Sequence, residues 1–295
     1  MPKVVLKKTG KNLIGNNKED AKCPLACDIL WKKRKRTMEN KEKQVISKKR
    51  VADHGEVLTA RREVDAMLDL VKQETERIES RFLEPACGTG NFLIVILERK
   101  LAVIDRKLAQ QEKRLKKSEK RPGWKAPFYE PDSLLALSSI YGIDILQDSV
   151  EAAKARLLAY YVESYQRIVG TDPKAELIAS ARFILEKNIL LGDAINTQEK
   201  VTVPGVPGLD KIVFTEWSRI GNDFKRREFR FDSMHLDGAE ADKKPQAHSD
   251  DLFAEEEVVQ HDVLTTDSGK EILKPQPVGE YPLTHYLKLT EIGDN

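Results

Sequence analysis

Phe82-Leu83-Glu84-Pro85-Ala86-Cys87-Gly88-Thr89-Gly90-Asn91-Phe92 is the stretch of this 295-residue sequence that decides the fold. A short apolar strand ends at Glu84, a turn with two glycines follows, and the apolar run from Phe92 to Leu97 predicts a buried helix. Glycine lets the turn adopt backbone angles closed to other residues and lets a ligand approach the main chain. The next helix offers free N–H groups at its N-terminus. This pattern predicts a strand, a ligand-binding loop and a helix.

Helices and strands alternate on both sides of this loop. Residues 60–78 carry apolar side chains at helical spacing, with Thr59 placed to cap that helix. Residues 139–145 predict a second buried strand followed by a long helix, and 182–184 and 188–193 predict a third strand region. Such alternation is typical of an α/β fold with a parallel sheet, here a partial Rossmann-like sheet.

The charge is distributed unevenly although the net charge is only +2. Residues 1–50 contain 16 Lys/Arg and 5 Asp/Glu, whereas residues 231–295 contain 5 Lys/Arg and 15 Asp/Glu. A basic arm favours binding of nucleic acid, because cations displace the counterions condensed on phosphates. The alternative is a solvated tail that only keeps the protein soluble. The candidate DNA-binding residues are Lys32, Lys33, Arg34, Lys35, Arg36, Arg226 and Arg227.

Composition excludes several classes of protein. No run of about eighteen apolar residues is present to span a membrane, and the three cysteines do not make a disulfide framework. Cys23 and Cys27 lie four residues apart, but a zinc site needs four ligands and no second pair is near, so no metal is expected. We expect a cytoplasmic protein.

We expect four parts along the chain. These are a basic N-terminal arm (1–50), a ligand-binding domain (51–198) that includes a charged helical extension (98–122), a β-hairpin (199–231) and an acidic, largely irregular tail (232–295). A narrow leucine seam at 101, 108 and 115 predicts that the extension is an exposed amphipathic helix.

Alternating side chains flank Gly221-Asn222-Asp223, which predicts the turn of the hairpin. Within the tail, residues 281–287 are the candidate for a short docking segment.

Acidic residues end the two strands after the glycine loop. A carboxylate at Asp144 can accept hydrogen bonds from both hydroxyls of a ribose, and one at Asp193 can accept from an exocyclic amine. Ligands of open α/β sheets bind at the carboxyl ends of the strands, so the two carboxylates and the glycine loop indicate an adenosine-sized ligand. The alternative is that each is only an acidic turn residue that terminates a strand.

The loop from Glu84 to Phe92 resembles the cofactor motif of the adenine-N6 DNA methyltransferases of restriction–modification systems. In order along the chain, residues 54–59 resemble the segment that covers the methionine moiety, 141–145 the ribose-binding strand, and 188–194 the strand whose aspartate meets the adenine amine. The resemblance spans residues 51–196 and implies S-adenosylmethionine as cofactor and DNA as partner. It implies these cofactor-binding residues: Thr59, Glu84, Ala86, Gly88, Gly90, Asn91, Asp144, Ile145 and Asp193.

The chain departs from this family in its catalytic motif. Members transfer the methyl group with an Asn-Pro-Pro-Tyr type of motif, in which the aromatic ring stacks on the flipped adenine. This sequence has no Pro-Pro dipeptide, and Gly221-Asn222-Asp223-Phe224 offers only an asparagine and an aromatic side chain. The catalytic residues are therefore unknown.

Three alternatives remain open. The chain is a subunit or half of a methyltransferase, completed by a companion methyltransferase, specificity or restriction subunit. Otherwise it is a regulatory protein that binds cofactor and DNA without catalysis, or it is a truncated remnant.

Overall fold

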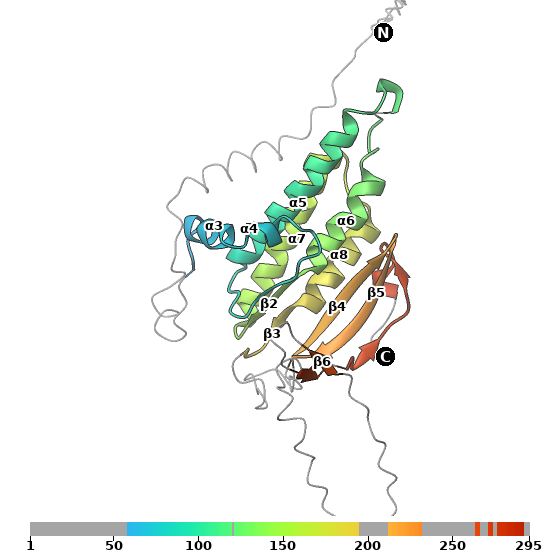
Figure 1. Ribbon diagram of the computed structural model, residues 1–295. Helices are drawn as coiled ribbons and strands as arrows, with labels where there is room; N and C mark the ends of the chain where they lie inside the picture. The colour runs from blue at the N-terminus through green and yellow to red at the C-terminus, as the bar shows by residue number, and fades with distance from the viewer. Residues whose placement is uncertain are drawn as a thin grey trace, which may run out of the picture. The chain divides into compact units, whose positions relative to one another are not determined.

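The computed structural model describes residues 58–119, 121–194, 212–231, 263–265, 271–273 and 276–291 (Figure 1). No helix within these ranges is both long and apolar enough to cross a membrane. The helices and strands are α3 (Arg61–Asp69), α4 (Lys72–Thr75), β1 (Phe82–Glu84), α5 (Asn91–Glu112), η1 (Lys117–Glu119), α6 (Ala126–Ser138), β2 (Ile140–Asp144), α7 (Gln147–Val169), α8 (Ala175–Asn188), β3 (Ile189–Leu191), β4 (Val213–Ile220), β5 (Asp223–Arg230), β6 (Val263–Thr265), β7 (Glu271–Leu273), β8 (Gly279–Glu280), β9 (Thr284–His285) and η3 (Leu289–Glu291).

A three-stranded parallel sheet lies at the centre of the fold, in the order β1-β2-β3. Phe82 pairs with Ile140, and Gly142 pairs with Ile189, so the three strands end at the same edge. Parallel strands require crossover connections, which α5, α6, α7 and α8 supply. The predicted α/β class is confirmed, and the strands predicted at 139–145 and 188–193 are present.

The strand predicted at 182–184 is wrong, because these residues lie within α8. Leu177, Ala181 and Ile184 are completely buried, and their spacing of four and three residues is that of one helical face. A short apolar segment fits the side-chain spacing of a strand as well as that of a helix. Here packing against α6 and α7 stabilises the helix.

The helix predicted at 60–78 is two helices, α3 and α4. The N-cap is Ala60 rather than Thr59, and the Ala60 N–H donates to Glu63 Oε2 at 3.1 Å. The Glu63 side chain, on the third residue of the helix, therefore satisfies the N–H of the N-cap residue, in place of the cap expected from the Thr59 hydroxyl.

The charged helical extension is less exposed than its sequence predicts. α5 continues only to Glu112, and Leu101 and Leu108 from the leucine seam are buried, at 0% and 2% exposure. α6, which the sequence pattern does not predict, packs beside α5 and covers this seam together with α7. The part of the expected extension that contains Leu101 and Leu108 therefore contributes to the hydrophobic core, whereas its described residues after Leu108 are exposed or partly exposed.

The predicted hairpin is confirmed, as β4 and β5 pair antiparallel around Gly221 and Asn222. Gly221 has a φ of 62°, the value that a two-residue turn with glycine at its first position requires. Phe214 and Phe231 of this hairpin form a small apolar cluster with Tyr141 and Ile143 of β2. The hairpin thus covers one face of the sheet.

The docking segment predicted at 281–287 is also confirmed. Tyr286 is buried and its hydroxyl donates to Glu130 Oε2 on α6 at 2.7 Å. Just before it, β9 adds to the outer edge of β5.

Candidate functional site

The glycine loop joins β1 to α5 at the carboxyl edge of the sheet. Gly88 and Gly90 have φ angles of 51° and 82°, in the left-handed region that other residues rarely adopt. A β-carbon at Gly90 would also lie 3.3 Å from the Ala153 β-carbon of α7. The left-handed turn and the close approach of α7 therefore both require glycine at position 90.

Asp144, the last residue of β2, is tied directly to this loop. Its Oδ2 accepts a hydrogen bond from the Gly88 N–H at 2.8 Å, and its Oδ1 accepts from the Leu146 N–H at 2.9 Å. Both oxygens keep a lone pair, because a carboxylate has about four acceptor positions. The carboxylate is thus held in a fixed orientation and can still accept two hydroxyl groups.

The ends of β2 and β3 are held together by a main-chain hydrogen bond. The Gly192 N–H donates to the Asp144 carbonyl oxygen at 3.0 Å. Asp193, the next residue, is half-buried, and Ile145 on the neighbouring connection is 50% exposed. The structure therefore places the predicted residues of both strand ends at the same edge as the glycine loop.

Asn91, the first residue of α5, links the loop to two other segments. Its Nδ2 donates to the Thr59 carbonyl oxygen at 2.9 Å, and its Oδ1 accepts from Arg156 Nη1 at 2.6 Å. Arg156 also donates to the Thr89 carbonyl oxygen at 3.3 Å. Arg156 was not predicted as a site residue; the one sequence signal is its position one helical turn after Ala153, which contacts Gly90.

The remaining residues of the loop have unusual electrostatic surroundings. Burial raises the pKa of Glu84, and a hydrogen bond from the Ala86 backbone opposes this shift. Burial, together with the charges of Asp144 and Glu84, raises the pKa of the Cys87 thiol to about 12. Ala86 itself is exposed. The Cys87 thiol therefore stays neutral at physiological pH and serves as apolar packing below the loop.

The candidate DNA-binding residues have different surroundings. Residues 32–36 lie outside the described residues, as do Cys23 and Cys27. The structure contradicts the prediction that Arg226 binds DNA. Its side chain is only 3% exposed, its guanidinium carbon lies 3.6 Å from the centroid of the Tyr281 ring, and it pairs with Glu228. Its guanidinium has no free surface for phosphate. Arg227 pairs with Glu216 and remains 38% exposed.

The hairpin turn does not fit the role of a substitute catalytic motif. The Phe224 ring is 1% exposed, so no base can stack on it. The Asn222 carbonyl oxygen accepts from the Tyr286 N–H at 3.0 Å, which ties the turn to the docking segment. This hairpin is a structural element.

Comparison with known protein families gives a match that covers the residues of this site. Residues 58–207 match the family model described as MmeI, DNA-methyltransferase domain, a range that begins just before Thr59 and contains β1, β2 and β3 with their connections. Comparison with curated proteins and with solved structures gives no match. The matched residues make up about half of the chain and contain the glycine loop, Asp144 and Asp193. The chain therefore belongs to the MmeI DNA-methyltransferase domain family, a family of restriction–modification DNA methyltransferases.

Proposed function

We propose that the carboxyl edge of the sheet binds S-adenosylmethionine and serves an adenine-N6 DNA methyltransferase of a restriction–modification system. One observation carries this proposal: the Asp144 carboxylate is fixed against the glycine loop by the Gly88 N–H, 56 residues away in sequence. A strand-end carboxylate beside a glycine turn is the arrangement in which an open α/β sheet holds a nucleoside. DNA as the substrate also implies a cytoplasmic location.

In this proposal different residues at the edge contact different parts of the cofactor. Asp144 accepts hydrogen bonds from the ribose hydroxyls, Ile145 packs its exposed side chain on the adenine ring, and Asp193 accepts from the adenine amine. The remaining residues hold the methionine end: Thr59, Glu84, Ala86, Gly88, Gly90 and Asn91. When bound, the cofactor supplies an electrophilic methyl group.

Glycine at position 88 leaves the main chain uncovered by a side chain of its own, so a ligand can approach it closely. The Leu58 side chain is its neighbour here, 3.6 Å from where a β-carbon on Gly88 would lie. The donor and acceptor groups that remain available, backbone amides and carboxylates, suit a zwitterionic amino acid linked to a nucleoside.

We further propose that another polypeptide completes the catalytic half. Among the described residues β1 pairs only with β2, so its second edge is open to a further strand. Leu83 is 43% exposed at this position. An added strand at this edge would end beside the glycine loop, which is where residues that hold the target adenine are required.

Calorimetric titration with S-adenosylmethionine tests the cofactor site. The wild-type chain is expected to bind, and Asp144→Ala is expected to weaken binding at least about tenfold, because a charge-assisted acceptor of two hydroxyls is lost. Glu151→Ala is the matched control, since Glu151 is an exposed carboxylate near the start of α7 that pairs with Lys154. Absence of binding, or equal binding by Asp144→Ala, contradicts the proposal.

A methyl-transfer assay tests the catalytic part. Transfer from labelled cofactor to adenine in unmethylated DNA is measured with and without the product of a neighbouring gene. Transfer that requires the second protein supports a split enzyme. Cofactor binding without transfer in either case favours the regulatory alternative, in which the chain binds cofactor and DNA only.

A further inference from the structure

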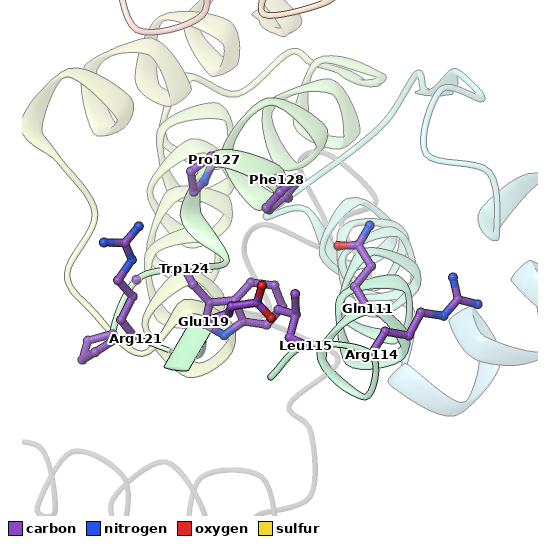
Figure 2. Close-up of a pocket in the computed structure, with 10 residues that line it drawn as sticks. Gln111, Arg114, Leu115, Glu119, Arg121, Trp124, Pro127 and Phe128 are labelled. Carbon is purple, nitrogen blue, oxygen red and sulfur yellow. The ribbon is translucent and has the colours of Figure 1, made fainter. Parts of the chain in front are cut away.

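A second concave surface lies far from the cofactor loop, at the end of α5. A cavity of about 640 Å³ opens between the last turn of α5 and the first turn of α6 (Figure 2). We call residues 111–119 and 121–128 the α5–α6 tip. α5 begins at the glycine loop and has 22 residues, so about 33 Å of helix separates the tip from the loop. The tip is therefore not part of the cofactor site.

Two aromatic rings form part of the wall of this cavity. Trp124 and Phe128 meet edge to face, with ring centroids 6.5 Å apart. Phe128 is 54% exposed, and Leu115 lies with Trp124 inside the cavity in Figure 2. An aromatic ring left this exposed beside a hollow has surface on which a flat apolar ligand can pack.

The surroundings of the rings are strongly basic. The segment from Arg106 to Lys125 contains nine Lys/Arg and only two carboxylates, Glu112 and Glu119. Glu112 pairs with Lys125 at 3.2 Å, and Glu119 accepts a hydrogen bond from the Lys116 N–H at 2.6 Å. Only the Glu112 charge has a cationic partner, but the cations in this segment outnumber the two carboxylates, so the surface as a whole attracts anions.

Two arginines flank the cavity and are available to a ligand. Figure 2 shows Arg114, just after the end of α5, and Arg121, on the connection to α6, at opposite sides of the aromatic residues. Both side chains are exposed, and within the described part of the chain neither forms an ion pair. A guanidinium binds phosphate with two parallel hydrogen bonds, so each arginine can hold one phosphate of a bound strand.

We propose that the α5–α6 tip binds single-stranded nucleic acid, with an unpaired base stacked on Phe128 and the flanking phosphates on Arg114 and Arg121. A cationic groove with exposed aromatic rings is the combination that holds single strands without regard to sequence. A paired base in a duplex has no free face to stack on a ring inside a cavity. This site is separate from the proposed cofactor site and does not depend on it.

Fluorescence anisotropy with labelled oligo(dT), oligo(U) and a duplex, each of about 15 nucleotides, tests this proposal. The full-length chain is used with residues 32–36 changed to glutamine, so that the basic arm does not obscure the tip. Both single strands are expected to bind at least about fivefold more tightly than the duplex, since stacking contributes to single strands alone. A preference for one of them identifies DNA or RNA as the source.

Substitutions separate the two parts of the site. Phe128→Ala is expected to weaken single-strand binding about fivefold or more, and Phe128→Tyr, which keeps the ring, to restore it. Arg114→Gln combined with Arg121→Gln is expected to lower the salt dependence of log Kd by about 0.7 for each phosphate that is no longer neutralised. Leu70→Ala and Arg62→Gln, two exposed positions on and beside α3, are the matched controls.

Three outcomes overturn the proposal. These are equal affinity for duplex and single strand, unchanged binding by Phe128→Ala, and an acidic peptide that binds the tip and is not displaced by the single strand. The last result would assign the tip to a protein partner instead.

Discussion

At the scale of single residues, Gly90 and Gly170 separate two effects of glycine. Both have a φ of 82°, but a β-carbon at Gly90 would meet Ala153, whereas one at Gly170 would meet nothing within 4 Å. A left-handed backbone costs a residue with a β-carbon about 1–2 kcal/mol. Gly170→Ala therefore reports the conformational cost alone.

Gly90→Ala is expected to destabilise the protein more than Gly170→Ala, by about 1 kcal/mol or more, because crowding is added to strain. Urea unfolding of the two variants measures the difference. Equal free energies of unfolding would contradict the close packing of the loop against α7.

Lys100 gives a pH dependence of stability. It is completely buried, and its Nζ donates to the Ile78 carbonyl oxygen at 3.0 Å and to Ser139 Oγ at 2.7 Å. Burial lowers its pKa from an ordinary value of 10.5 to about 7, although Glu79 and Glu74 oppose the shift. Between these two values the unfolded chain holds a proton that the folded chain has lost.

Unfolding in this window therefore takes up a proton, and the free energy of unfolding is expected to rise with pH between 7 and 10.5, by up to about 1.4 kcal/mol per unit. Urea unfolding at several pH values measures this slope for the wild type and for Lys100→Met. The variant should be less stable at every pH, because its carbonyl partners lose their donor, and should lack this part of the slope. The same slope in both proteins would show that another group is responsible.

At the scale of elements, the attachment of the hairpin to the sheet depends on Trp217. Its indole N–H donates to Asn188 Oδ1 at 3.0 Å, and Asn188 Nδ2 in turn donates to the carbonyl oxygens of Ser138 and Ile140. Trp217 and Asn188 are both buried. One amide thus joins β4 to α8 and β2.

Trp217→Phe is expected to lower the free energy of unfolding by about 1–3 kcal/mol, because the Asn188 oxygen is left buried without a donor. Ile220→Ala is the control, since Ile220 lies on the same strand with 63% exposure and should change stability by less than about 0.5 kcal/mol. Thermal unfolding compares them. Equal effects would mean that the hairpin is held by surface contacts only.

The elements also show how far a sequence predicts this fold. β1, the glycine loop and β2 are predictable because glycine and strand-end aspartates are local signals. α6 is not, since Tyr129, Leu134, Ala136 and Leu137 are buried on several sides of it and leave no helical period. The exposure expected for the leucine seam is wrong at Leu101 and Leu108 for a related reason, because α6, which the sequence does not reveal, packs beside α5.

The candidate site, too, is only partly predictable from the sequence. Asp144 is identified from its position at a strand end, but the contact of Arg156 with Asn91 joins residues 65 apart in sequence and follows from the packing of α7. Arg226 is a candidate for binding DNA from the sequence, where it stands in the alternating pattern of the hairpin beside two other basic residues, Lys225 and Arg227. Alternation shows that a strand has two faces but not which face is buried, and here Tyr281 covers the arginine.

At the scale of the whole molecule, cofactor and single-stranded nucleic acid are assigned to opposite ends of α5. The two sites are expected to respond independently, because the helix between them packs ten of its residues in the core and coupling between distant sites requires an element with two arrangements. Single-strand affinity of the tip should therefore be the same with and without S-adenosylmethionine.

Hydrogen exchange measured by mass spectrometry, with and without saturating S-adenosylmethionine, tests the cofactor site most directly. Slower exchange is expected in peptides that contain residues 86–91 and 144–146, whose backbone amides line the proposed site. Peptides from the α5–α6 tip should be unchanged. Cofactor binding that leaves the loop and the end of β2 unprotected, or that protects another region instead, would contradict the assignment of the cofactor to this edge of the sheet.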